Sequence, residues 1–283
     1  MFFKYHSMKS ILIVDDNSAR AKHAAEFAFL IAQKMKANIV LANVIGAKDK
    51  VKAGKIYAGM PTDEIKQTPA CLAHYLTLLN DRPNDFEPSV TEIDTSGMDE
   101  NELVRVIQKN EIWMVAAGIS DDAALQHEGH NLNWNIILNN IQCPLLLIPQ
   151  SWSLKNIERL VYIADLRYCR IQIVKFLAML AHSFYADLSV AQLAVRGLPH
   201  MEEQYARQLF NDEISANVNY DQLFFNNIKE QNLNVALDVL INGMHNDMLV
   251  VLNHRFHFEE IIGRYVANNL PKHITVPILI FPY

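Results

Sequence analysis

The residues best suited to contact a ligand stand in a short polar segment near the start of the chain. Residues 11–14 are all apolar, and Asp15-Asp-Asn-Ser18 follows them directly. Open α/β sheets bind ligands beyond the carboxyl ends of their strands, so Asp16 could accept hydrogen bonds from a polar ligand. Asp16 also suits a helix cap or an Asx-turn, and both interpretations stay open. We expect Ser18 to be a cap rather than a nucleophile, because no Gly-x-Ser-x-Gly motif surrounds it.

Histidines form two pairs whose spacing raises the question of a metal. His127 and His130 fall in one loop, and His254 and His257 fall in the corresponding loop of the second half. A spacing of three residues could direct two imidazoles to one ion. No cysteine is near either pair, and the two spacings are not equivalent in the loops. We therefore predict solvated loop histidines and no metal site, with metal binding kept as an alternative.

No set of residues predicts catalysis. The chain has no P-loop, no Gly-x-Gly-x-x-Gly after its first apolar run, and no Cys–His pairing of a known pattern. Asp15 and Asp16 are adjacent and would point in different directions. The cysteines Cys71, Cys143 and Cys169 show no Cys-x-x-Cys spacing and fit a reducing compartment. We expect a protein without robust catalysis, with slow turnover of a bound nucleotide as the upper limit.

Composition narrows the class of protein further. A chain of 283 residues, 51% hydrophobic and 20% charged, is large enough for two folded domains. A net charge of −6 without a basic block argues against binding to nucleic acid. No apolar run reaches the roughly 18 residues of a membrane span, and residues 1–7 lack the features of a signal peptide. We expect a cytoplasmic protein that uses neither nucleic acid nor membrane.

The elements that would position these residues begin with a strand–helix–strand unit. Residues 11–14 read as a buried strand, Ala21–Met35 as an amphipathic helix and 38–45 as a second strand. Such a unit crosses over in the right-handed sense. The further elements expected in the first half are strands at 89–93, 112–117 and 143–149, and helices at 70–79, 100–109 and 132–140.

The second half repeats the first. Ala186–Leu193 matches Ala37–Val44, and the same alignment places Asp165 on Asp16. Further on, Met248–Leu252 matches Met114–Gly118, and the two halves close on similar apolar runs. The elements expected in the second half are strands at 160–164, 188–195, 218–225, 248–252 and 276–282, and helices at 171–184, 199–215 and 233–244. We predict two domains, residues 1–150 and 151–283.

Each domain is predicted to be α/β, with a doubly wound, mostly parallel, Rossmann-like sheet of five strands. The layout resembles the universal stress protein family over nearly the whole chain. The resemblance rests on an apolar strand followed by Asp16-x-Ser18, a helix over 24–34, a strand that closes at Val44, and the closing Cys143-Pro-Leu-Leu-Leu-Ile-Pro149. It implies the fold of adenine nucleotide alpha hydrolase-like proteins.

Nucleotide-binding members of that family carry a glycine motif after the fourth strand: Gly, two residues, Gly, nine residues, Gly, then Ser or Thr. Glycines there let backbone N–H groups approach phosphate oxygens, and the last stands at a helix N-terminus. Gly118 fits the first position, but Asp121 takes the second, where its charge would repel phosphate. The last position falls on Asn131, or on Gly129-His130 if the loop is two residues shorter.

The second half departs further from this pattern. No glycine follows Val251 until Gly263, and Arg264 stands in place of the Ser or Thr. Asp165 is kept, but Leu166-Arg167 replace the small and hydroxyl residues beside it. The resemblance therefore implies that any nucleotide, ATP or AMP, binds in the first half. Its implied contacts are Asp16 with ribose or adenine, Val44 with the base, and Ser18, Gly118, Gly129, His130 and Asn131.

These observations favour a cytoplasmic universal stress-type protein with a binding or signalling role and degraded ATP-binding motifs. One alternative is a nucleotide-binding regulator that uses the first-half pocket. Another is a module that binds a small molecule or metal through the histidine loops. The resemblance implies that the final strands, within 144–149 and 277–282, pair the two halves as an internal pseudo-dimer. The further partners we expect are a second copy in a homodimer and an unidentified protein.

Overall fold

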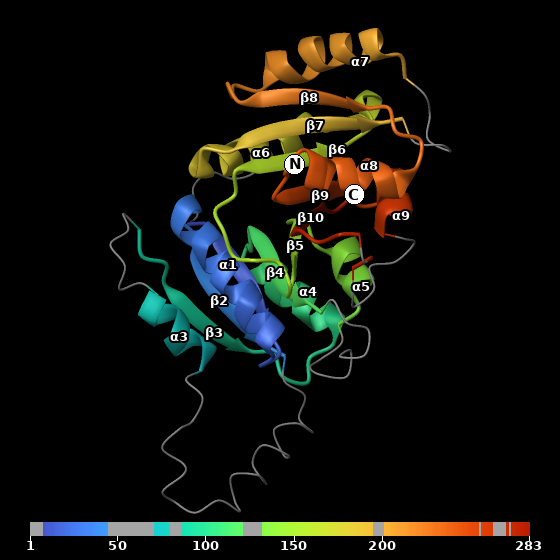
Figure 1. The fold of residues 1–283 in the computed structure, drawn as a ribbon. Helices are drawn as coiled ribbons and strands as arrows, with labels where there is room; N and C mark the ends of the chain where they lie inside the picture. Colours follow the sequence, from blue (N-terminus) through green and yellow to red (C-terminus); the bar gives the residue numbers. More distant parts are fainter. Residues whose placement is uncertain are drawn as a thin grey trace, which may run out of the picture.

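The strands of the computed structural model form one ten-stranded sheet in the order β3-β2-β1-β4-β5-β10-β9-β6-β7-β8 (Figure 1). The structure describes residues 8–44, 71–79, 86–120, 132–194, 201–254, 256–262, 270–271 and 273–283. The strands are β1 (Ser10–Asp15), β2 (Asn38–Asn43), β3 (Val90–Asp94), β4 (Met114–Ile119), β5 (Leu145–Pro149), β6 (Arg159–Ile163), β7 (Asp187–Leu193), β8 (Leu223–Ile228), β9 (Met248–Leu252) and β10 (Ile278–Phe281).

Helices cover both faces of this sheet. They are α1 (Ala19–Met35), α3 (Leu72–Leu79), α4 (Glu100–Lys109), α5 (Trp134–Asn140), α6 (Ile171–Phe184), α7 (Glu203–Leu209), α8 (Leu233–Asp238) and α9 (Phe256–Ile262). The α/β fold with a mostly parallel sheet confirms the predicted class. Among the residues that the structure describes, no helix is long and apolar enough to cross a membrane.

The repeat is visible in how the first helix of each half ends. Lys36 follows α1 and Tyr185 follows α6, and the alignment of the two halves places one on the other. Both adopt the left-handed conformation, with φ of 51° and 57°, and their N–H groups bond to carbonyls of the last helical turn. A residue in this conformation terminates a helix and satisfies its free carbonyls. The first helix of each half therefore ends in the same way, at positions that the repeat aligns.

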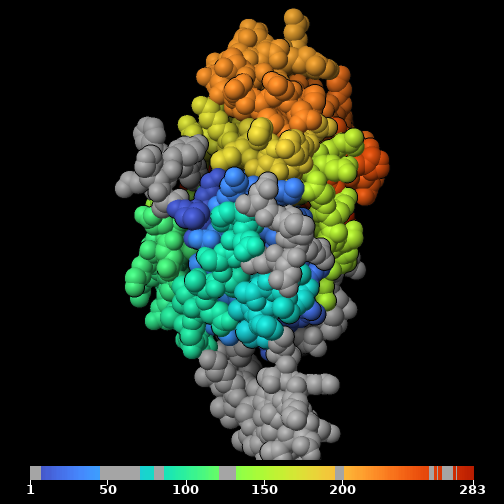
Figure 2. Space-filling view, turned by 90° about the vertical axis from the view of Figure 1, so that its left-hand side faces the viewer, coloured from blue at the N-terminus to red at the C-terminus, as the bar shows by residue number. Residues whose placement is uncertain are grey.

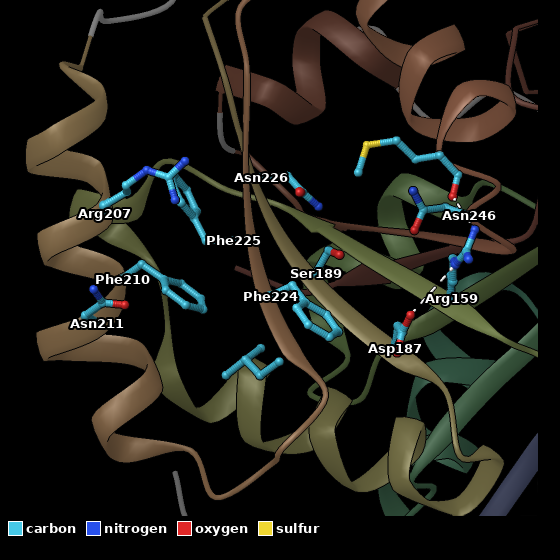
Figure 3. Close-up of a pocket in the computed structure, with 12 residues that line it drawn as sticks. Arg159, Asp187, Ser189, Arg207, Phe210, Asn211, Phe224, Phe225, Asn226 and Asn246 are labelled. Carbon is cyan, nitrogen blue, oxygen red and sulfur yellow. Dashed lines mark hydrogen bonds and ion pairs between the residues drawn. The ribbon is translucent and has the colours of Figure 1, made fainter.

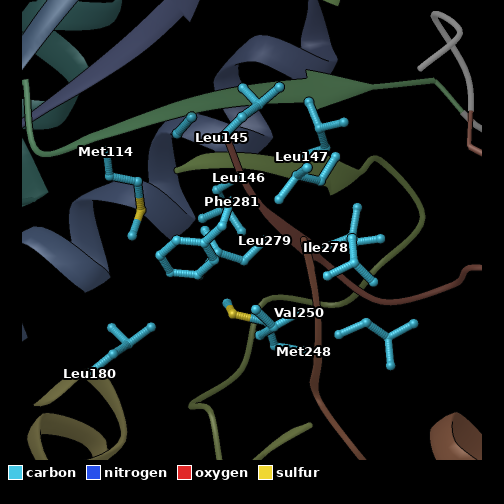
Figure 4. Close-up of a cluster of buried hydrophobic side chains, with 14 of the residues drawn as sticks. Met114, Leu145, Leu146, Leu147, Leu180, Met248, Val250, Ile278, Leu279 and Phe281 are labelled. Atoms are coloured by element: carbon cyan, nitrogen blue, oxygen red, sulfur yellow. The ribbon is translucent and has the colours of Figure 1, made fainter. Parts of the chain in front are cut away.

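The two halves join through their last strands. β5 and β10 pair antiparallel, with Leu145 opposite Ile280 and Leu147 opposite Ile278. These four side chains are fully buried, and Figure 4 shows Leu145, Leu147 and Ile278 at the junction. Burying each contributes roughly 1.5–3 kcal/mol relative to exposure. The segments 144–149 and 277–282 thus pair as predicted, and the two expected five-stranded sheets are continuous with each other.

An aromatic stack reinforces this junction. Trp113, from the loop before β4, stacks on Phe176 of α6 with ring centroids 4.7 Å apart. Phe176 in turn meets Phe281 of β10 edge-on at 5.1 Å. Aromatic pairs in such geometries add about 0.5–1.5 kcal/mol to the effect of burial alone. The second-half helix α6 is therefore anchored on residues of both halves.

The third strand of the second half was predicted wrongly. The apolar stretch at 218–225 indicated a strand, whereas β8 spans Leu223–Ile228. Val218 instead buries its side chain just after the preceding helix, and the Tyr220 hydroxyl bonds to the carbonyl of Ala186. Apolar residues that pack under a loop were thus mistaken for the start of the strand.

Two helices of the second half are also less regular than predicted. The helix expected at 199–215 is α7 followed by a π-helical segment, Phe210–Ile214, and a 3-10 turn, Ser215–Asn217. The helix expected at 233–244 is α8 followed by a second π-helical segment, Val239–Gly243. Periodicity predicts that a segment is helical but does not distinguish the i→i+5 pattern of a π-helix.

Candidate functional site

The predicted site lies where β1, β2 and β4 end and α1 begins. β1 ends at Asp15, and the N–H of Val44, just beyond β2, donates to the Asp15 carbonyl at 2.9 Å. Gly118 lies in β4, against the first turn of α1. The structure thus brings Asp16, Val44 and Gly118 together beyond the carboxyl ends of these strands. The predicted contacts Gly129, His130 and Asn131 lie outside the described residues.

Asp16 is held by its own loop and helix. Its Oδ1 accepts hydrogen bonds from the N–H of Ser18 at 3.1 Å and from the Ser18 hydroxyl. Its Oδ2 lies 2.7 Å from Nη2 and 3.2 Å from Nε of Arg20. The side chains of Arg20 and Asp16 are only 9% and 8% exposed. Both carboxylate oxygens are therefore engaged within the chain.

Ser18 caps α1, as predicted. Its backbone is extended, and its Oγ accepts a hydrogen bond from the N–H of Ala21 at 3.2 Å. This bond satisfies one of the free N–H groups of the first turn. The hydroxyl also donates to Asp16, so the cap and the carboxylate form one network. Arg20 is the residue of this network that the sequence analysis missed, although an arginine four residues after Asp16 was a signal for an ion pair.

Asp15 makes a separate turn of its own. Its Oδ1 accepts from the N–H of Asn17 at 2.8 Å, closing an Asx-turn in which Asn17 has a φ of 59°. Burial raises the pKa of the Asp15 carboxyl, and the nearby charges of Asp16 and Glu92 raise it further, against the lowering effect of the Asn17 hydrogen bond. The two adjacent acids therefore have different hydrogen-bond partners.

Gly118 has a structural reason to be glycine. A Cβ at this position would lie 2.2 Å from the carbonyl oxygen of Arg20 and 2.5 Å from its carbonyl carbon. The first turn of α1 therefore packs directly on the backbone of β4. Close approach of helix and strand is one established role of glycine in folds of this kind. The packing alone accounts for Gly118, without a phosphate.

The second half reproduces the acid–arginine pair with different spacing. Asp165 accepts from Arg167 through its backbone N–H at 3.1 Å, its Nε at 2.9 Å and its Nη2 at 2.5 Å. Leu252 takes the place of Gly118 in the alignment of the halves. The repeat places Tyr168 on the first residue of α1, whereas α6 starts only at Ile171. The second half therefore combines a buried leucine at the position of Gly118 with a helix that starts three residues later.

The histidine loops are described only in part. His127 and His130 lie outside the described residues, and so does the side chain of His257. The His254 Nε2 lies 2.7 Å from Oδ1 of Asn139, which belongs to α5 of the first half. Within the described ranges, no group of three or more His, Cys, Asp and Glu residues is placed to hold a metal ion. His254 is thus part of the junction between the halves.

A cavity of about 630 Å³ lies elsewhere, around strand β8 (Figure 3). Sequence reasoning did not predict it, because its residues come from three strands and two irregular helix ends that only the fold brings together. Figure 2 places α7 and β8, in orange, at one end of the molecule. This cavity is distant in the fold from Asp16, since the first half ends at β5 and four strands separate β5 from β8.

Comparison with known proteins agrees with this fold. The model of the universal stress protein family matches residues 8–149. A universal stress protein from Archaeoglobus fulgidus DSM 4304 aligns over 96% of this chain and 97% of its own, with 10% identity and a TM-score of 0.64. A functionally unknown protein from Pseudomonas aeruginosa PAO1 aligns over 97% and 92%, with 13% identity and a TM-score of 0.52.

Among curated proteins, none matches the chain significantly. The structural likenesses, at 10% and 13% identity, establish the fold alone. The family model covers half of the chain, from just before β1 to the end of β5, and includes Asp16, Ser18, Val44 and Gly118. The chain belongs to the universal stress protein family.

Proposed function

We propose that this chain is a cytoplasmic universal stress-type protein that acts by binding or signalling, without robust catalysis and without tight binding of ATP. The observation that carries the proposal is the buried ion pair between Asp16 and Arg20, 2.7 Å apart. The acid that would contact a nucleotide is already neutralised by the chain. In this proposal Asp16 stabilises the loop between β1 and α1.

The energetics of the pair support this role. To contact a ligand, Asp16 would have to leave Arg20, which is itself 9% exposed. Separating the partners of a buried ion pair costs about 3–5 kcal/mol when nothing replaces the lost partner. A nucleotide would have to offset this with hydrogen bonds of its own. Binding energy would thus be lost before any affinity is gained.

The same reasoning extends to the second half. Asp165 is 9% exposed and bonded to Arg167 through three donors. Leu252, which is buried, stands where the first half has Gly118. We propose that residues 1–150 and 151–283 are two copies of one domain, and that the second has lost nucleotide binding entirely.

The second candidate is a regulator that binds ATP or AMP in the first half. It is favoured by one specific observation: the first half keeps the direct packing of α1 on β4 at Gly118, which the second half lacks. That packing fixes the N-terminus of a 17-residue helix beside the carboxyl ends of the strands. Anions bind favourably at such termini.

Thermal melts with ATP, AMP and zinc test the proposal. At a ligand concentration about 100 times Kd, binding to the native state adds about 2.7 kcal/mol of stability, which raises Tm measurably. We expect no rise in Tm with any of the three ligands at about 1 mM, which is 100 times a Kd of 10 µM.

The matched variants are Asp16→Asn in the first half and Asp165→Asn in the second. A rise in Tm with ATP that Asp16→Asn abolishes and Asp165→Asn leaves intact would overturn the proposal in favour of the regulator. A rise with zinc would instead support a metal site in the histidine loops.

A further inference from the structure

The two edges of the ten-stranded sheet differ in how they are protected. β3, at one edge, carries the acidic residues Glu92 and Asp94. β8, at the other, reads Leu-Phe-Phe-Asn-Asn-Ile without a charge or a proline. Native sheets protect exposed edges against pairing with charges, prolines or short irregular strands. β8 lacks the first two devices, which marks it as an edge suited to pairing.

The free hydrogen-bonding groups of this edge can be assigned from its pairing with β7. Leu188 donates to the Gln222 carbonyl at 2.9 Å, and Ala194 donates to the Ile228 carbonyl at 2.9 Å. In a parallel pair, alternate residues face the neighbouring strand, so the even-numbered residues of β8 bond to β7. The backbones of Leu223, Phe225 and Asn227 therefore point outward, and among the described strands none lies beside them.

The cavity around β8 has room for side chains on both sides of such an added strand. On one side Phe225 stacks on Phe210 with ring centroids 5.4 Å apart, and Asn211 lies beside them. On the other side lie Phe224, 46% exposed, and Asn226. Figure 3 shows these two groups on opposite sides of the β8 ribbon. Side chains of an incoming strand alternate between two sides in the same way.

We propose that the occupant is a second copy of this chain, with β8 pairing antiparallel to β8 of the partner about a twofold axis at Phe225. In this register Phe225 is opposite its counterpart, and Leu223 is opposite Asn227. All three outward-facing residues then form hydrogen-bonded pairs, which gives about six backbone hydrogen bonds. The contact is isologous, so it closes as a dimer rather than growing into a fibre.

Charge complementarity selects both the partner and the register. Asp221 lies in the turn just before β8, Lys229 follows the strand directly, and both are exposed. With Phe225 on the axis, the turn that carries Asp221 comes beside Lys229 of the partner subunit, so two opposite-charge pairs form. A slip of one residue in each strand would place Asp221 opposite Asn227 or Lys229 opposite Leu223 instead. The sequence at both ends of β8 is thus complementary to itself in one antiparallel register.

The contact that Lys229 makes within its own chain does not oppose this. Its Nζ lies 2.7 Å from a carboxylate oxygen of Glu203, but the lysine side chain is 72% exposed. Exposed pairs of this kind contribute little to stability. Glu203 also keeps Arg207, whose Nη2 lies 2.9 Å away. Lys229 can therefore turn to a partner without leaving Glu203 unpaired.

Sedimentation of the full 32.3 kDa chain tests the dimer and its register. We expect the wild-type protein to have twice the mass of the chain. Asp221→Lys or Lys229→Asp alone creates two like-charge pairs, which should raise the dissociation constant roughly tenfold or more. Mixing the two variants pairs Lys with Asp at both positions again and should restore a dimer of wild-type affinity.

Two further variants separate pairing from folding. Asn227→Pro removes an outward N–H without touching the bonds to β7, a position where an edge strand tolerates proline. It should give a monomer whose Tm is close to that of the wild-type protein at dilutions where the dimer dissociates. Glu92→Lys, on the opposite edge, should leave the mass unchanged. Two results would overturn the proposal. One is a wild-type protein that stays monomeric at about 100 µM, where a dimer with a Kd of about 1 µM is mostly formed. The other is a dimer that the charge reversals leave unaffected.

Discussion

Removing the positive charge of Arg20 tests the central element of the first-half site. Arg20→Met keeps much of the apolar stem and deletes the guanidinium, which leaves the Asp16 carboxylate without its cation. Because the two side chains are 9% and 8% exposed, the loss should be that of a buried pair, about 3–5 kcal/mol in the free energy of unfolding. The reference is Arg167→Met, whose arginine is 33% exposed. Solvent screens that pair, so we expect a loss of at most about 1 kcal/mol.

Urea denaturation followed by circular dichroism measures both losses. With a slope of about 3 kcal/mol per M, Arg20→Met should lower the midpoint by about 1–2 M. The double variant Asp16→Asn/Arg20→Met should recover part of this loss, because it removes the uncompensated charge. Equal losses for Arg20→Met and Arg167→Met, or no recovery in the double variant, would refute the role assigned to burial. Either result would leave Asp16 available to a ligand and would weaken the proposed function.

Three further predictions concern single side chains. Gly118→Ala places a Cβ against the Arg20 carbonyl and should cost about 1–3 kcal/mol by urea denaturation, whereas Gly243→Ala, with its nearest contact at 3.8 Å, should cost far less. Asp15→Asn should stabilise the protein at neutral pH, because burial raises the pKa of the Asp15 carboxyl above 3.8 in the folded protein. In the wild-type protein the carboxyl therefore favours folding below pH 3.8, and this contribution is lost as the pH rises through the folded pKa. An equal pH dependence of unfolding in the two proteins would contradict this. Of the three cysteines, only the exposed Cys71 should react with a thiol reagent in the native protein, since burial raises the pKa of the Cys143 and Cys169 thiols to about 12. Reaction of all three thiols would contradict this.

Much of the fold follows from patterns in the sequence. Short apolar runs located most of the strands, because strands buried on both faces of a parallel sheet need continuous apolar residues. The exception, β8, lies at an edge, where its side chains are only partly buried or exposed and the pattern is weak. The capping role of Ser18 was also predictable, since caps are local and depend on few residues.

The partners of the site residues were less accessible to sequence reasoning. The reason for Gly118 became clear only once α1 was placed on β4, because it depends on a contact with Arg20, far away in the sequence. The cavity around β8 brings together Phe210, which lies in a π-helical segment, and Phe224 and Asn226 of β8. Periodicity predicts that this segment is helical but does not distinguish a π-helix from an α-helix.

The two halves also show which feature of the site the repeat has retained. In the first half the arginine follows its aspartate by four residues, which is one helical turn and suits a helix that starts at Ala19. In the second half α6 starts only at Ile171, and position 169, four residues after Asp165, falls at the end of a 3-10 turn. An arginine there could not reach back along a helix, and Arg167 makes the contact instead. The same ion pair is thus formed by a different geometry in each copy, as expected if the pairing itself, rather than a shared ligand, is what the loop requires.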